Sequence, residues 1–171
     1  METWDAIRAR RNVRAYTDRA IADDDLDRIL EAGRRAPSAS NTQPWDFVVV
    51  TDRSDLQELS RVWQGAGHIA GSAATIVLVA PITDDPRRAG WIEYDHGQAA
   101  LQMAVAAADL GIGSGHSAIG DQDGLRRLLG IPGDRRGASM LALGYPADRP
   151  LAPLTKLNRR PFEELVHRGR W

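Results

Sequence analysis

The stretch from about Trp91 to Leu110 predicts one long helix that lies at the centre of the fold. Its segment GQAALQMAVAAADLG is rich in alanine and apolar on nearly every side. A helix of that kind is stable when neighbouring elements cover it on several sides. Gly111 is positioned to end it. A chain of 171 residues suits one domain built around such a helix, so we expect a single domain over residues 1–171.

Three apolar runs predict the strands that accompany this helix. The continuous runs FVVV at residues 47–50 and TIVLVAP from Thr75 indicate buried strands, the first of them covered on both faces, and ASMLALGYP at residues 138–146 is a third candidate. Shorter helices are predicted at residues 2–10 and 23–33, from Ser54, at 123–130 and at 162–168. Three or four strands among many helices are typical of an α+β or α/β domain, and the pattern does not fix the strand order.

Composition excludes several classes of function. The chain has no cysteine, which excludes disulfides, thiolate metal sites and cysteine nucleophiles. Its formal net charge of -1 gives no overall attraction to nucleic acid or to a membrane surface. No apolar run approaches the roughly 20 residues that a membrane span requires, and the charged N-terminus does not resemble a signal peptide. We therefore expect a cytoplasmic protein.

The segment RARRNVRAY concentrates arginine at the end of the first predicted helix. Arg8, Arg10, Arg11 and Arg14 fall within seven residues, and Asn12 with Val13 interrupts the helix among them. One interpretation is a solvated basic helix end. The other is a phosphate site, because guanidinium groups spread around a helix end offer forked donors to an anion.

A glycine-rich stretch, GIGSGHSAIG, follows the long helix from Gly111 to Gly120. It does not match the dinucleotide-binding fingerprint, because His116 occupies the third glycine position and the stretch follows a helix rather than a strand. Its glycines instead suit the close approach of another chain or of a flat ligand to the backbone.

Histidine and serine give no catalytic constellation. The four histidines are far apart and lack metal-ligand spacing, so no metal site is predicted, and only His116 gains interest from its glycine-rich neighbours. No serine lies at the centre of a nucleophile elbow. We therefore predict no catalytic acid, base or nucleophile from this chain.

Taken together, four segments resemble the FMN-dependent nitroreductase family, in the order in which that family has them. They are RRNVRAY, APSASNTQPWDFVVV, the alanine-rich helix with GIGSGHSAIGD, and the tail LALGYPAD with RRPFEELVH. The resemblance covers nearly the whole chain. It implies an α+β fold of three α-β-α layers around a central mixed or antiparallel sheet. It also implies an obligate homodimer with FMN in two sites, each built from both subunits.

The resemblance further implies which residues bind the cofactor. Those of one subunit would hold the phosphate and the polar edge of the ring, and the Pro-Ser-x-x-Asn turn of the partner subunit would lie against the flavin. The first group is Arg10, Arg11, Asn12 and Arg14, with His116, Ser117 and Ala118 at the border of the ring and Arg159 or Arg160 as a second phosphate contact. The second group is Pro37, Ser38, Ala39 and Asn41, with Arg35 as a further candidate.

The implied activity is hydride transfer from NAD(P)H through the flavin N5 atom to an electron-poor acceptor, in a ping-pong sequence. Nitroaromatics, quinones and activated alkenes are acceptors of that kind. Two alternatives stay open: another flavin reaction on the same fold (substrate dehydrogenation, reductive dehalogenation or flavin cleavage) and flavin binding without turnover. His116 stands where many relatives have Trp. The short connection after the helix at Ser54 predicts an open pocket.

Overall fold

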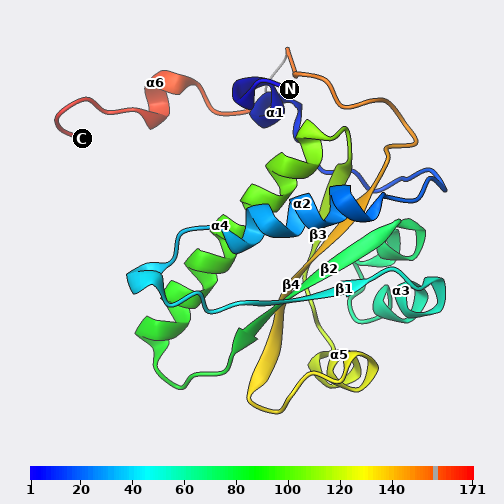
Figure 1. Ribbon diagram of the computed structural model, residues 1–171. Helices are drawn as coiled ribbons and strands as arrows, with labels where there is room; N and C mark the ends of the chain where they lie inside the picture. Colours follow the sequence, from blue (N-terminus) through cyan, green and yellow to red (C-terminus); the bar gives the residue numbers. More distant parts are fainter. Residues whose placement is uncertain (156–157) are drawn as a thin grey trace.

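A four-stranded sheet forms the middle layer of the computed structural model, which describes residues 1–155 and 158–171 (Figure 1). The strands β1 (Asp46–Val50), β2 (Ala74–Pro81), β3 (Gly113–Ser117) and β4 (Arg135–Gly144) are all paired antiparallel, in the order β1-β2-β4-β3. Helices cover both faces of this sheet, so the predicted α+β class with three α-β-α layers is confirmed.

Each face of the sheet has its own set of helices. The helices are α1 (Thr3–Ala9), α2 (Asp23–Arg34) and α4 (Pro86–Asp109) on one side, and α3 (Arg53–Leu59) and α5 (Gln122–Leu129) on the other, with the short η1 (Ala39–Asn41), η2 (Gly67–Gly71) and α6 (Phe162–Leu165) outside these layers or at their edges.

The side chains of β2 alternate between two hydrophobic cores, one on each face of the sheet. Ile76 and Leu78 pack with α2 and α4, whereas Val77 and Val79 pack with α3 and α5. Successive side chains of a strand point to opposite faces, so this one central strand anchors both layers. The prediction of β2 as a buried strand is therefore confirmed.

The central helix is longer than predicted and less enclosed. It begins at Pro86, because the Asp85 carboxylate caps its first turn by accepting a hydrogen bond from the Arg87 N–H at 2.9 Å. Its inner side is buried, but Trp91, Tyr94 and Leu101 are 49%, 61% and 54% exposed. These positions are three and seven residues apart and share one side of the helix, which leaves an apolar stripe on the surface.

Two strand predictions were wrong. The run at residues 47–50 is only partly covered: Val48 and Val50 pack on one core and Phe47 on the other, but β1 is an edge strand and Val49 is 36% exposed. The glycine-rich stretch was not among the predicted strands, yet Gly113–Ser117 forms β3, paired with β4 along its whole length. Glycine weakens a strand, so this pairing outweighs the local preference.

Candidate functional site

The arginine segment and the glycine-rich strand, predicted separately, lie side by side. Asn12 forms a parallel bridge with Ser114 of β3, and the Val13 N–H donates to the Ser114 carbonyl oxygen at 2.9 Å. Asn12 is exposed beside this contact, and the backbone of residues 12–16 rests directly on β3. The expected close approach to the glycines is thus made by the chain's own segment.

Gly115 makes this approach possible. A Cβ atom at Gly115 would lie 2.4 Å from the Val13 carbonyl oxygen and 2.8 Å from the Tyr16 hydroxyl oxygen. Both atoms are held in place, because the Tyr16 hydroxyl donates to the Val13 carbonyl at 2.7 Å. No larger residue fits here without moving the segment that carries Asn12 and Arg14.

We predict that Gly115→Ala lowers the free energy of unfolding by about 2 kcal/mol, because overpacking forces the backbone to shift. Chemical denaturation of the two proteins measures the loss. Gly133→Ala is the control, since a Cβ there meets no atom within 4 Å. Equal stability of the Gly115 variant and the parent would contradict the steric role of this glycine.

Two arginines of the segment keep free guanidinium groups. Arg11 is engaged, since its Nη2 donates to Asp148 at 2.7 Å and to the Arg149 carbonyl oxygen at 2.9 Å. Within the described ranges, 1–155 and 158–171, the side chains of Arg10 and Arg14 have no hydrogen bond or ion pair. Arg10 lies close enough to β3 to act on His116. The pKa of His116 is lowered, first by desolvation and then by the positive charge of Arg10.

The residues predicted to border the flavin ring, His116 to Ala118, lie at the carboxyl end of β3. Ser117 is buried, and its hydroxyl donates to the Ala118 carbonyl oxygen at 3.2 Å. Ala118 and His116 are exposed. This end of the strand therefore presents an imidazole, a backbone edge and two free arginines on one surface, which is a donor set for a phosphate and a polar ring edge.

A second predicted group forms a strained loop at residues 37–45. Ser40, Asn41 and Gln43 have φ values of 51°, 55° and 48°, a conformation that residues other than glycine seldom adopt and that costs on the order of 1–3 kcal/mol each. Within the loop, the Ser38 hydroxyl accepts from the Gln43 N–H at 2.9 Å. A loop held in this form needs support from its surroundings.

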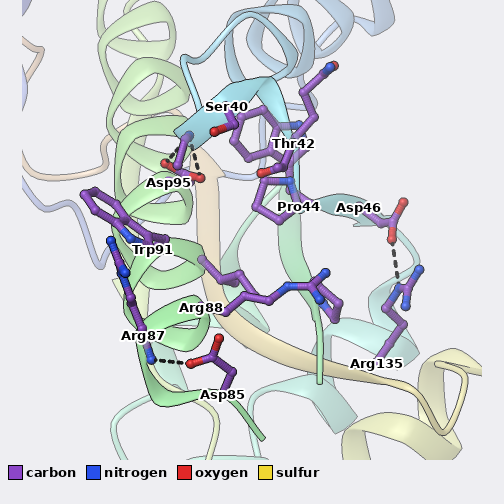
Figure 2. Close-up of a pocket in the computed structure, with 15 residues that line it drawn as sticks. Ser40, Thr42, Pro44, Asp46, Asp85, Arg87, Arg88, Trp91, Asp95 and Arg135 are labelled. Atoms are coloured by element: carbon purple, nitrogen blue, oxygen red, sulfur yellow. Dashed lines mark hydrogen bonds and ion pairs between the residues drawn. The ribbon is translucent and has the colours of Figure 1, made fainter. Parts of the chain in front are cut away.

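Helix α4 provides that support through two buried polar residues, Asp95 and His96, and Figure 2 shows Asp95 beneath the loop. Both carboxylate oxygens of Asp95, which is 1% exposed, accept from the Ala39 N–H at 3.1 and 3.2 Å. The adjacent His96, 3% exposed, pairs through Nε2 with the Pro44 carbonyl oxygen at 2.9 Å. Neighbouring residues of one helix thus hold the loop near both its ends.

The burial of His96 makes the fold sensitive to acid. Its Nδ1 is buried and has no hydrogen-bond partner among the described residues. Desolvation lowers the pKa of His96, and the nearby Glu93 and Asp95 carboxylates offset this only in part. Because the folded protein holds the neutral ring, stability is fully present above the ordinary histidine pKa of about 6.5 and is lost as the pH falls below it.

We therefore predict that the melting temperature falls between pH 7.5 and pH 5.5, and that His96→Gln reduces this fall. A glutamine can donate to the Pro44 carbonyl but does not titrate. Thermal melts of both proteins at the two pH values measure the difference. If the variant loses as much stability on acidification as the parent does, His96 does not carry the effect.

The other predicted residues lie elsewhere in the chain. Arg35 follows α2 as its C-cap residue and pairs with Glu31 at 2.6 Å, and Pro37 is exposed nearby. Arg159 and Arg160 belong to the tail that leaves the body near α1 (Figure 1). The Arg160 Nε pairs with Glu164 within that tail at 3.3 Å, and Arg159 donates to the Asn158 carbonyl.

Within one chain, the two groups of residues predicted to bind the cofactor lie apart. The loop at residues 37–45 follows the carboxyl end of α2, whereas the segment at residues 10–14 lies away from it, next to β3 (Figure 1). Asp95 and His96, which support the loop, were missed by sequence reasoning. Other polar residues, Glu93 and Gln98, flank them in the sequence, so no local pattern marked Asp95 and His96 as the buried pair.

Among residues 1–155 and 158–171, no three acidic or histidine side chains gather as metal ligands. In that same part of the chain, no helix has the length and apolar character to cross a membrane.

The chain is similar to known proteins over almost its whole length. The model of the family described as "Nitroreductase family" matches residues 7–66 and 55–145. A homologue from Archaeoglobus fulgidus, named NADH dehydrogenase/NAD(P)H nitroreductase, is 35% identical over 174 residues and covers 96% of both chains. A Bacillus subtilis protein named "FMN reductase [NAD(P)H]" is 28% identical over 92% of this chain and 69% of its own.

Solved structures share the fold. An "FMN-dependent Nitroreductase" from Clostridium difficile superposes with a TM-score of 0.83 at 25% sequence identity, covering 97% of this chain and 98% of the other. The similarity therefore extends over all three layers and includes both predicted groups of residues.

Proposed function

Because this chain belongs to the nitroreductase family, we propose that it is an FMN-dependent oxidoreductase that passes hydride from NAD(P)H to an electron-poor acceptor. The family is one of oxidoreductases, and its members named above use nicotinamide nucleotides or FMN. Nitroaromatics, quinones and activated alkenes are the proposed acceptors, used in a ping-pong sequence. The observation that carries the proposal is the surface where free Arg10 and Arg14 flank β3.

The residues at this surface fit a flavin mononucleotide. Arg10 and Arg14 offer charged forked donors suited to a phosphate dianion, and Asn12, His116 and the backbone beside Ala118 offer polar contacts for a ring edge. Bound FMN supplies the hydride chemistry at its N5 atom. The protein then needs to bind, orient and shield, which agrees with the lack of a predicted catalytic acid, base or nucleophile.

We propose that two copies of the chain complete the site. The loop at residues 37–45 and β3 lie apart in one chain (Figure 1), so the loop of a partner would supply Pro37, Ser38, Ala39 and Asn41. The exposed apolar side of α4 supports self-association, because Tyr94 and Leu101, outside the loop's surroundings, form a surface of the kind found in subunit interfaces. Arg35, Arg159 and Arg160 remain proposed additional contacts.

The absorption spectrum of the purified protein, with its mass in solution, tests this function. Flavin bands near ~370 and ~450 nm on a dimer, bleached by NADH or NADPH and restored by menadione or a nitroaromatic, are expected. A flavin that menadione and nitroaromatics do not reoxidise would indicate binding without this turnover. Substrate oxidation by oxygen without NAD(P)H would indicate another flavin reaction. A colourless monomer that does not bind added FMN would refute the proposal.

A further inference from the structure

A cavity of about 780 Å³ opens between the loop at residues 39–46 and the first turns of α4 (Figure 2). Its volume is within the range of small-molecule sites. Ala39 and Ser40 form one wall, so the cavity adjoins the loop that is proposed to face the partner's flavin. Arg87, Arg88 and Trp91 from α4 form the opposite wall, and we call this cavity the Arg–Trp pocket.

The acidic groups of the Arg–Trp pocket already have partners. Asp46 lies 3.5 Å from the Nε of Arg135, Asp85 accepts from the Arg87 N–H, and Asp95 accepts from the Ala39 N–H. Asp85 also occupies the end of the helix. An anion entering the pocket would therefore bind to side chains rather than to the helix terminus.

The guanidinium groups of Arg87 and Arg88 are the cationic donors that α4 presents to the pocket. Neither side chain makes a hydrogen bond or ion pair with the residues that the structure describes, and Figure 2 shows Arg88 reaching from α4 across the cavity. Two neighbouring arginines present several forked N–H groups, which match the oxygens of phosphate, sulfonate or carboxylate. This leaves an unused binding capacity for an anion.

A flat apolar surface lies beside these arginines. Trp91 follows Arg87 by four residues and Arg88 by three, so all three share one side of the helix. Its indole is 49% exposed and is one wall of the cavity. A ring stacked on this indole would carry its anionic group within reach of the arginines, a combination suited to a ligand that is both aromatic and anionic.

We propose that the Arg–Trp pocket binds the anionic group of a reactant of the flavin: the phosphates of the nicotinamide nucleotide or the acidic group of an acceptor. This inference rests on the proposed function, because the neighbouring loop is proposed to lie against the partner's flavin. A reactant anchored at Arg87 and Arg88 would then extend past Ser40 toward that flavin. The two sources share one chemistry and are separated by the choice of reactant.

The first test uses binding without turnover. The flavin-loaded protein is titrated by calorimetry with ADP-ribose and with naphthalene-2-sulfonate, two redox-inert aromatic anions. In Arg87→Gln/Arg88→Gln, binding of at least one of them is expected to weaken about tenfold, which is one charge-assisted contact after allowance for solvent screening. Unchanged binding of both anions, or binding of neither by the parent protein, would overturn the proposal whatever the turnover.

The second test assigns the anion to a reactant. NADH and NADPH are compared with neutral 1-benzyl-1,4-dihydronicotinamide as donors, and naphthoquinone-2-sulfonate is compared with menadione as acceptors. A drop of about tenfold in kcat/KM for NADH and NADPH alone assigns the pocket to the nucleotide. A drop for the sulfonate alone assigns it to the acceptor. An equal drop for charged and neutral reactants would contradict anion binding.

The control and the parent enzyme keep the two proposals distinguishable. Arg61→Gln/Arg127→Gln removes two exposed charges on the opposite side of the sheet and is expected to match the parent in every assay. If the parent turns over neutral donor and acceptor but the pocket variant behaves like the parent with charged reactants, the pocket inference fails and the proposed function stands. If the parent binds the anions but never reduces its flavin, the proposed function fails instead.

Discussion

Arg10→Ala/Arg14→Ala is expected to purify without flavin from cells in which the parent protein purifies yellow. Both guanidinium groups are free of protein partners among the described residues, and both flank β3. Each charge-assisted hydrogen bond to the phosphate contributes about 1.5–3 kcal/mol. Losing two therefore weakens FMN binding by about 3–6 kcal/mol, which is at least a hundredfold. Fluorescence titration of the apoprotein with FMN measures the change directly.

Arg61→Ala/Arg127→Ala is the matched control for this double variant. It removes the same formal charge from the other helical layer and is expected to retain flavin. Thermal melts of the apoproteins show whether the site variant is folded, since exposed arginines without partners contribute little to stability. A folded Arg10→Ala/Arg14→Ala protein that still purifies yellow would show that the phosphate lies elsewhere.

Arg10 and Arg11 are neighbours in the sequence, but in the described part of the chain only Arg11 is engaged by other residues, and the sequence does not predict this difference. The structure brings Arg10 close enough to His116 for its charge to lower the pKa of that side chain, whereas the arginine pattern left both a phosphate site and a solvated helix end open. The pattern could not distinguish Arg11 from Arg10, although the Arg11 guanidinium is engaged by Asp148 and the Arg149 carbonyl. These partners are more than 130 positions away in the chain, and no local pattern indicates a contact over that separation.

The missed strand β3 has a similar cause. Glycine has low strand propensity, so local preference predicted no strand at Gly113–Ser117. Pairing with β4 along five residues and the approach of Val13 to Gly113 and Gly115 determine the outcome. The glycines are required because another segment lies on the strand, and that requirement becomes visible only after the chain has folded.

The burial of β1 was overestimated because the coverage of a strand depends on its position in the sheet. A run of valines predicts a strand, but whether its faces are covered depends on strand order, which the pattern did not fix. Here β1 is at the edge and is continuous with the loop at residues 37–45. The apolar sequence of this strand is thus compatible with a surface position next to the proposed interface.

Asp95→Leu is expected to release the loop at residues 37–45 and with it much of the flavin affinity. The Asp95 carboxylate is buried, accepts the Ala39 N–H, and has no cation within ion-pair distance in the described part of the chain. Its removal leaves that N–H without its acceptor and three residues with positive φ without support. We expect a loss of about 3 kcal/mol in the free energy of unfolding.

Asp95→Asn separates the positioning of the loop from a general loss of stability. Its amide oxygen can still accept the Ala39 N–H, so the visible spectrum of bound flavin and the FMN affinity are expected to return largely to those of the parent. Asp52→Ala is the second control: it removes a carboxylate that accepts two backbone N–H groups at the start of α3, in the other helical layer, and costs about 1 kcal/mol. If Asp95→Leu is destabilised but keeps FMN as tightly as Asp52→Ala does, the loop does not contact the flavin. If instead the Leu variant loses the cofactor and the Asn variant retains it, an interior carboxylate of α4 controls a cofactor site that one chain alone cannot complete.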